Sequence, residues 1–203
     1  FPQKQFNVVT YNSTGSGQSI TGVGFQPDLV WVKWRGGDQG NGLFDSSRGT
    51  SKVLQSDSTG AENTSSGLTS FDSDGYSMGE YYNQSGRNYV GWCWRANGGT
   101  TSSNSDGSIT STVQANTKAG FSIITYAGTG SNATIGHGLS AKPDFFTIKN
   151  RDGGTGMAWT TYHSSLGATK YLELDAKDQA YTGSTRFNDT EPTTSTISLG
   201  TIS

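Results

Sequence analysis

The chain has 203 residues, of which 31% are hydrophobic, 11% are aromatic and 29 are glycines, and its formal net charge is −2. A nearly neutral chain with interspersed charges lacks the basic surface that nucleic-acid binding requires, and its apolar runs are far too short to cross a membrane. Cys93 is the only cysteine, so no disulfide can form within the chain. Its position between Trp92 and Trp94 predicts a buried, unreactive thiol.

Alternation of apolar and polar residues predicts short β-strands along the whole chain. The clearest strands cover, in chain order, residues 29–33, 89–94, 108–113 and 170–174. Between them lie clusters of glycine, asparagine, aspartate and serine, which are typical of tight turns. No window of a dozen residues shows the periodicity of an amphipathic helix, so we expect an all-β fold.

The same series of strands occurs twice. Residues 6–11 (FNVVTY) resemble 121–126 (FSIITY), residues 27–33 (PDLVWVK) resemble 143–149 (PDFFTIK), and residues 46–52 (SSRGTSK) resemble 164–170 (SSLGATK). The spacing between copies grows slowly along the chain, as expected when two copies of one fold differ in loop length. The repeat therefore predicts two tandem antiparallel β-sandwich units of the lectin or jelly-roll kind.

The repeat also sets the expected domain boundaries. Unit one is predicted over residues 1–96, a polar linker over 97–106 and unit two over 107–203. Unit one continues into the aromatic segment 89–94, whereas unit two reaches the matching residues 196–200 without a counterpart of that last strand. Either the native chain is longer, which is the preferred interpretation, or another chain covers the open edge, because exposed strand edges favour strand addition.

Comparison of the two copies separates core positions from surface positions. Val30 and Val32 correspond to apolar residues in unit two, so this face of the strand is predicted to point inward. Trp31 corresponds to Thr147, and Trp34 also corresponds to a polar residue. These two tryptophans are therefore specific to unit one and are expected to be exposed.

Few groups point to catalysis or to a metal site. Asp72 and Asp74 form part of a calcium-loop pattern, but the other ligands of that pattern are absent, so a hairpin turn is the preferred interpretation. His163 lies beside serines without the glycine-flanked elbow of a hydrolase, and carboxylates such as Asp45 and Glu80 are scattered. We therefore expect neither a cofactor nor an enzymatic activity.

Aromatic residues on this polar scaffold are the stronger signal. Flat rings can stack on sugar faces at a small cost in side-chain entropy. The candidates for exposed, ligand-binding aromatics are Trp31, Trp34, Tyr81, Tyr82 and Trp159. For each residue taken singly, ordinary packing or a contact between subunits is the preferred interpretation.

Five segments resemble a known family: residues 10–33, 71–76 (FDSDGY), 90–98 (VGWCWRANG), 106–121 and 162–167 (YHSSLG). Together they resemble a repeated domain of unknown function in bacteriophage structural proteins of the tail and fibre type, sometimes joined to concanavalin-like lectin domains. The resemblance covers nearly the whole chain. It implies a role in the virion, but it carries no catalytic or ligand-binding residues over to this sequence.

The expected function is that of a non-enzymatic virion protein in a tail fibre, head fibre or capsid decoration. Its partners would be other virion proteins, further copies of the chain and a host-surface glycan, with no nucleic acid and no membrane insertion. An alternative is a carbohydrate-binding module of a secreted protein. A polysaccharide depolymerase is a third hypothesis, and it requires two carboxylates that converge in a cleft.

Overall fold

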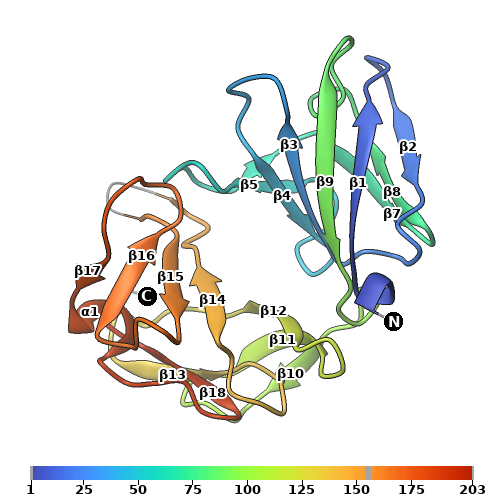
Figure 1. The fold of residues 1–203 in the computed structure, drawn as a ribbon. Helices are drawn as coiled ribbons and strands as arrows, with labels where there is room; N and C mark the ends of the chain where they lie inside the picture. The colour runs from blue at the N-terminus through green and yellow to red at the C-terminus, as the bar shows by residue number, and fades with distance from the viewer. Residues whose placement is uncertain (1, 154–156, 203) are drawn as a thin grey trace. The chain divides into compact units, whose positions relative to one another are not determined.

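The computed structural model describes residues 2–153 and 157–202, which form two compact units (Figure 1). Unit one extends to Ser56 and continues over Gly60–Thr100, while unit two takes Asp57–Thr59 and the chain from Thr101 onward. Helix in the described residues is limited to α1 (Ser184–Phe187) and the 3₁₀-helix η1 (Pro2–Lys4), and no described helix is long and apolar enough to cross a membrane. The expected all-β class is confirmed.

Unit one contains two antiparallel sheets. The larger has the strand order β1-β9-β3-β4-β5-β6, and the smaller has the order β2-β8-β7. The strand bounds are β1 (Phe6–Asn12), β2 (Gln18–Thr21), β3 (Leu29–Trp34), β4 (Gly42–Asp45), β5 (Lys52–Gln55), β6 (Asn63–Thr64), β7 (Leu68–Asp72), β8 (Gly75–Met78) and β9 (Asn88–Trp94). β9 lies between β1 and β3 in the larger sheet and pairs with both.

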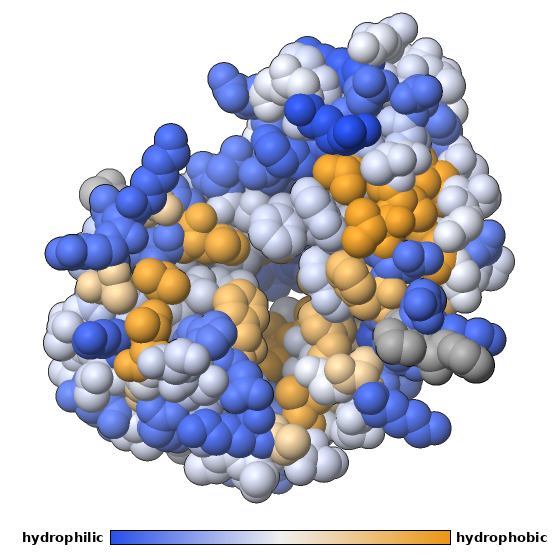
Figure 2. Space-filling view, viewed as in Figure 1, coloured by the Kyte–Doolittle hydropathy of each residue, from blue (hydrophilic) through white to orange (hydrophobic). Residues whose placement is uncertain are grey.

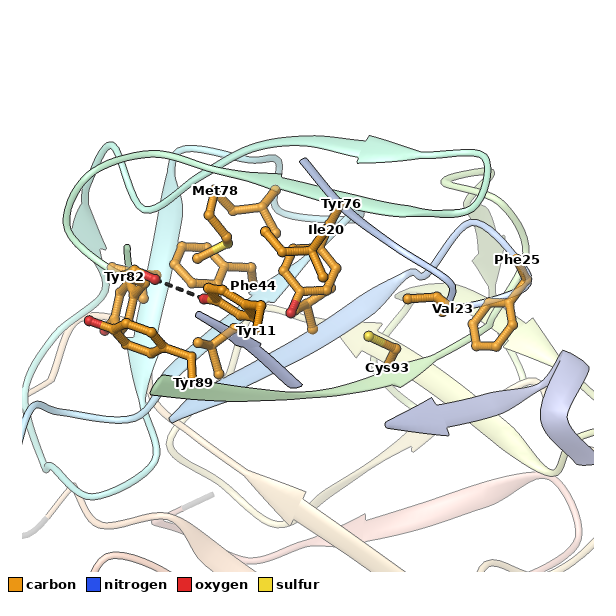
Figure 3. Packing of buried hydrophobic residues seen from close by; sticks show 14 residues of the cluster. Tyr11, Ile20, Val23, Phe25, Phe44, Tyr76, Met78, Tyr82, Tyr89 and Cys93 are labelled. Carbon is orange, nitrogen blue, oxygen red and sulfur yellow. Dashed lines mark hydrogen bonds between the residues drawn. The ribbon is translucent and has the colours of Figure 1, made fainter. Parts of the chain in front are cut away.

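Side chains of both sheets form one core in unit one (Figure 3). Alternate residues of a strand point to opposite faces, and Val30 and Val32 on the inner face of β3 are both 0% exposed, as the sequence predicts. The rings of Tyr11 on β1 and Tyr89 on β9 stack with their centroids 5.3 Å apart. Large aromatic side chains thus compensate for the small share of apolar residues.

Cys93 lies in this core and is 0% exposed. Burial raises the pKa of its thiol to about 12, so the thiolate is scarce at neutral pH. The predicted burial of Cys93 is therefore confirmed, and the raised pKa agrees with an unreactive thiol.

Unit two contains three sheets, with the strand orders β10-β11-β12, β13-β18 and β14-β15-β16-β17. The bounds are β10 (Ser102–Asn104), β11 (Ser111–Asn116), β12 (Phe121–Thr125), β13 (Ala133–Gly136), β14 (Phe145–Ile148), β15 (Thr160–His163), β16 (Lys170–Glu173), β17 (Tyr181–Thr182) and β18 (Thr196–Leu199). One group of core residues is Ile135, Ile197 and Leu199. A second group, centred on Tyr162 and Phe187, packs under β14 and β16.

The strand predicted over residues 108–113 begins later than expected. β11 starts at Ser111, because Ile109 instead forms an isolated parallel bridge with Ile135. Ser108 and Thr134 also exchange hydrogen bonds, because the backbone N–H of each donates to the side-chain hydroxyl of the other. The start of the segment is thereby bonded to β13 rather than to β12.

Residues 97–106, expected to form a polar linker, are hydrogen-bonded over much of their length. The residues that follow β9 fold back onto the carboxylate of Asp28, which accepts hydrogen bonds from the backbone N–H groups of Ala96 (2.7 Å), Gly98 (3.0 Å) and Gly99 (2.7 Å). The next residues form β10, which pairs with β11. Backbone hydrogen bonds, which composition does not reveal, hold this polar segment in place.

Candidate ligand-binding site

A hollow of about 450 Å³ lies on unit one, where the loop after β8 meets the end of the larger sheet. It is lined by Val53, Gln55, Asn63, Thr64, Ser65, Ser66, Tyr81 and Tyr82. Two of the five aromatic residues singled out in the sequence, Tyr81 and Tyr82, are thus brought together. No lining residue carries a formal charge, so a neutral ligand suits this hollow best.

Tyr82 forms the inner end of the hollow and is only 1% exposed. Its ring meets the ring of Phe44 edge to face, with centroids 5.5 Å apart. Its backbone carbonyl accepts a hydrogen bond of 2.8 Å from the hydroxyl of Tyr11, drawn as the dashed line in Figure 3. The exposure expected for Tyr82 is therefore wrong, because its side chain belongs to the core.

Tyr81 is the exposed ring of the hollow, with 47% of its surface accessible. Its ring stands edge-on to the ring of Tyr82 at a centroid distance of 5.0 Å. The side-chain amides of Gln39 (2.5 Å) and Gln84 (3.4 Å) donate hydrogen bonds to its backbone carbonyl. A fixed backbone and a buried neighbour hold this ring in place while leaving it open to a ligand.

Amide and hydroxyl groups surround the two rings. Gln55, Asn63, Thr64, Ser65 and Ser66 come from β5, β6 and the turn that follows β6. Such side chains both donate and accept hydrogen bonds, as sugar hydroxyls do. Sequence reasoning missed these five residues, because a polar turn composition is common throughout this chain.

Trp31 lies on the outer face of the larger sheet rather than in the hollow. It is opposite Trp92 in the β3–β9 register, and the two ring centroids are 5.7 Å apart. Trp31 is half-buried, and its indole nitrogen is buried without a hydrogen-bond partner among the described residues. The exposed residues Phe6 and Val8 lie on the same sheet, and Figure 2 shows hydrophobic surface over β1 and β9.

Trp34 borders a separate depression of about 400 Å³, with Arg35, Gly36, Gly86 and Asn88. The guanidinium of Arg87 lies 4.0 Å from the centre of its ring. A Cβ built at Gly37 would come within 2.4 Å of the same ring, so the glycine backbone packs closely against it. Since both the guanidinium and the glycines cover the indole, it offers little surface for stacking a sugar.

Trp159 belongs to unit two and is 5% exposed, so the exposure expected for it is also wrong. It immediately precedes β15, and its backbone N–H donates a hydrogen bond of 2.8 Å to the carboxylate of Asp175. The side chain packs into the unit, where it cannot serve as an open platform.

The carboxylates of Asp72 and Asp74 have structural partners in unit one. Asp72 accepts hydrogen bonds of 2.7 Å from the hydroxyls of Ser70 and Ser77, and it pairs with Gly75 across the β7–β8 hairpin. Asp74 accepts hydrogen bonds from the backbone N–H groups of the β2–β3 loop, at Gly22 (3.1 Å) and Gly24 (2.6 Å). The hairpin interpretation of this segment agrees with these contacts.

No group of three histidine, cysteine, aspartate or glutamate side chains that could hold a metal occurs within residues 2–153 and 157–202. Asp45 and Glu62 are both bonded to Arg48, at 2.5 and 3.0 Å, and all three side chains are nearly buried. His137 is 1% exposed, and burial lowers its pKa. These charged and titratable groups therefore stabilise loops rather than converge on a cleft.

Comparison with known proteins adds the family but no relative of known activity. No curated protein and no solved structure matches the chain. A family defined only as a domain of unknown function matches every residue from 1 to 203. The chain belongs to this family, the domain of unknown function DUF7483.

Proposed function

We propose that the chain is a non-enzymatic adhesion module of a bacteriophage virion, in which unit one binds a surface glycan in the hollow beside Tyr81. The observation that carries the glycan part is the fixed, 47% exposed ring of Tyr81 in an uncharged hollow lined by amides and hydroxyls. An aromatic face stacks on the apolar face of a sugar ring, and the surrounding polar groups bond to its hydroxyls. The virion part rests on the resemblance of the repeated segments to phage structural proteins.

In this proposal the two units are tandem β-sandwiches of the lectin or jelly-roll kind. The arrangement of unit one supports it, because two antiparallel sheets contribute to a single core. In such a module the sheets are a rigid scaffold, and the loops at their ends carry the binding residues.

Assembly with further copies or with other virion proteins is the second part of the proposal. Phe6 and Val8, at 39% and 42% exposure, lie on an edge strand of the larger sheet of unit one. A contiguous apolar patch of this kind on a sheet is a common feature of protein interfaces. The charged variant Val8→Glu should therefore lower the molecular mass measured in solution by light scattering, while a monomeric wild type would contradict this part.

The glycan site is tested with a glycan array followed by calorimetric titration of the best ligand. Tyr81→Ala should weaken binding about tenfold or more while the circular dichroism spectrum stays unchanged, because the lost ring is exposed. Phe145→Ala removes an exposed aromatic side chain in unit two and serves as the matched control. Absence of any bound glycan, or equal affinities of wild type and Tyr81→Ala, would overturn the glycan site.

The biological setting needs a different experiment. Antibodies against the chain should label intact phage particles in electron micrographs, and no label on any particle would remove the virion proposal. If binding to glycans survives but the chain is found free in the medium, the carbohydrate-binding module of a secreted protein replaces it.

A further inference from the structure

The depression beside Trp34 is a second concave site of unit one and shares no lining residue with the hollow at Tyr81. Its volume is about 400 Å³, and it lies where the end of β3 meets the start of β9. The backbone N–H of Arg35 donates a hydrogen bond of 2.8 Å to the carbonyl of Asn88 there. The larger sheet therefore fixes the two chain segments that carry the site.

The lining offers hydrogen-bond donors that the protein itself leaves unused. The guanidinium of Arg35 and the side-chain amide of Asn88 are exposed, and neither has a hydrogen-bond partner among residues 2–153 and 157–202. The Nε1–H of Trp34 also lacks a partner in that part of the chain and, unlike the indole nitrogen of Trp31, is not buried. A guanidinium presents two parallel N–H donors to a carboxylate, and indole and amide N–H groups add single donors. This set of donors suits a planar anion.

The charge at the depression is positive. Arg35 is the only charged residue among the described residues that line it, and the guanidinium of Arg87 adds a second cation 4.0 Å from the centre of the Trp34 ring. Arg87 donates its side-chain hydrogen bond of 3.1 Å to a neutral amide. The acidic residues of the same two loops, Asp38 and Glu80, are exposed, do not line the depression and form no ion pair with either arginine in the described structure. An anionic ligand would therefore meet two arginines that no carboxylate of the described chain neutralises.

The size of the depression favours a carboxylate carried by a sugar ring over a free ion. Pockets for small organic ligands span roughly 300–1,000 Å³, and this volume lies in that range. The glycines of the lining leave room for a ring, since no atom lies within 4 Å of a Cβ built at Gly86. Because Arg87 covers a face of the Trp34 indole, the ligand meets the edge of that ring and its Nε1–H.

We propose that the Trp34 depression binds an acidic sugar through its carboxylate. The guanidinium of Arg35 holds the carboxylate with two parallel hydrogen bonds. The Nε1–H of Trp34 and the amide of Asn88 bond to the neighbouring oxygens of the sugar. This site differs in chemistry from the hollow at Tyr81, whose lining carries no formal charge.

One side chain connects the two sites. The amide nitrogen of Gln39 donates a hydrogen bond of 2.5 Å to the backbone carbonyl of Tyr81. Its amide oxygen accepts hydrogen bonds from Arg87 (3.1 Å) and from the hydroxyl of Tyr89 (2.8 Å). An oligosaccharide in which acidic and neutral units alternate would therefore reach both sites. This joint occupancy rests on the proposed glycan function of the hollow, whereas the carboxylate site does not.

The test titrates ¹⁵N-labelled protein with methyl β-D-glucuronide and with methyl β-D-glucoside, which carry a carboxylate and a hydroxymethyl group at the same carbon. The five tryptophans give five indole N–H signals in the NMR spectrum, and Trp34→Phe identifies the signal of Trp34. The glucuronide should shift this signal to saturation, and the glucoside should bind at least tenfold more weakly. Arg35→Gln should weaken glucuronide binding about tenfold or more. Lys4→Gln, at another exposed cation of unit one, should leave it unchanged.

Acetate and inorganic phosphate test the class of ligand. Acetate, which has the carboxylate without the ring, should bind at least tenfold more weakly than the glucuronide, and phosphate should also bind more weakly. Absence of a saturable shift at Trp34, equal binding of the glucoside, acetate or phosphate, or an unchanged affinity of Arg35→Gln would each overturn the proposal.

Tyr81→Ala separates the two sites. It should leave the binding of methyl β-D-glucuronide at Trp34 unchanged, so the carboxylate site can stand or fall independently of the hollow. A tetrasaccharide of alternating glucuronate and N-acetylglucosamine should lose affinity in both Arg35→Gln and Tyr81→Ala. A loss in Arg35→Gln alone would overturn the joint occupancy.

Discussion

The hydroxyl of Tyr162 donates a hydrogen bond of 2.5 Å to the carboxylate of Glu191. The same carboxylate accepts hydrogen bonds from the ammonium of Lys142 (2.8 Å) and from the backbone N–H of Ala168 (2.7 Å). These residues lie in four separate parts of unit two, so one side chain connects β15 to three loops. The bonds to Lys142 and Tyr162 lower the pKa of Glu191 from 4.5 to about 2.

This shift predicts a loss of stability of unit two in acid. Because the folded pKa lies below the unfolded value, the stabilisation is fully present above pH 4.5 and disappears as the pH falls toward 2. The Glu191 side chain is 47% exposed, so its contribution is that of a screened surface pair, about 1 kcal/mol.

Glu191→Gln should therefore reduce the free energy of unfolding of unit two by about 1 kcal/mol at pH 7. The difference between variant and wild type should vanish near the folded pKa of about 2. Urea unfolding at a series of pH values measures this, with Asp152→Asn as a surface control. A constant difference across the series would show that another group governs the response to acid.

Removal of the Asp28 carboxylate should destabilise unit one much more than Glu191→Gln destabilises unit two. Its buried carboxylate accepts hydrogen bonds from the hydroxyl of Ser46 (2.8 Å) and from three backbone N–H groups. Asp28→Ala leaves these donors without their acceptor and should destabilise unit one by about 3 kcal/mol or more. The repeat supplies a matched control, because Asp144→Ala removes an exposed carboxylate and should change stability by less than about 0.5 kcal/mol. Chemical denaturation followed by tryptophan fluorescence compares the two, and equal effects would contradict the role of Asp28.

The sequence predicted most strands and the inner face of β3, because alternation of apolar residues directly reflects which side of a strand is buried. The sequence did not predict correctly which aromatic residues of the loops are exposed. Tyr81 and Tyr82 lie in a turn, where no periodicity distinguishes an inward from an outward ring. Tyr82 is buried by Phe44 and Tyr11, residues far away in the chain. Such long-range contacts are not visible in a local pattern.

The polar residues of the hollow and of the supposed linker were missed for a related reason. Serine, threonine, asparagine and glycine occur throughout the chain, so their local abundance does not distinguish a binding turn from any other turn. Only the fold shows that Asn63 and Thr64 form a short strand beside the two tyrosines, or that Gly98 and Gly99 are fixed by Asp28. The comparison of the two copies was more informative, because a difference at matched positions points to a difference in surroundings.

Gly67 packs closely against the rings of Phe44 and Tyr82, the aromatic pair beneath the hollow. A Cβ at this position would come within 2.6 Å of the ring of Phe44 and 2.9 Å of the ring of Tyr82. Gly67→Ala should therefore force the two rings apart and destabilise unit one by about 1–3 kcal/mol. Gly17→Ala is the control, because no atom lies within 4 Å of a Cβ built there and its backbone is not left-handed. Thermal unfolding of the two variants measures the difference, and an unchanged Gly67→Ala would mean that the rings can move freely.

Cys93 belongs to the same core as Phe44 and Tyr82, so the reactivity of its thiol measures how readily this core opens. It is 0% exposed and its pKa is raised to about 12 by burial, so a folded chain offers almost no reactive thiolate to an alkylating reagent at pH 8. Labelling by iodoacetamide should therefore proceed only through opening of unit one, at a rate set by the stability of that unit. Asp28→Ala should accelerate labelling roughly 100-fold, as a loss of about 3 kcal/mol implies, whereas Glu191→Gln in unit two should leave the rate unchanged. Mass spectrometry at timed intervals measures both rates. If the two variants were labelled equally fast, Cys93 would be reached by local motion, and the close packing around it would have to be abandoned.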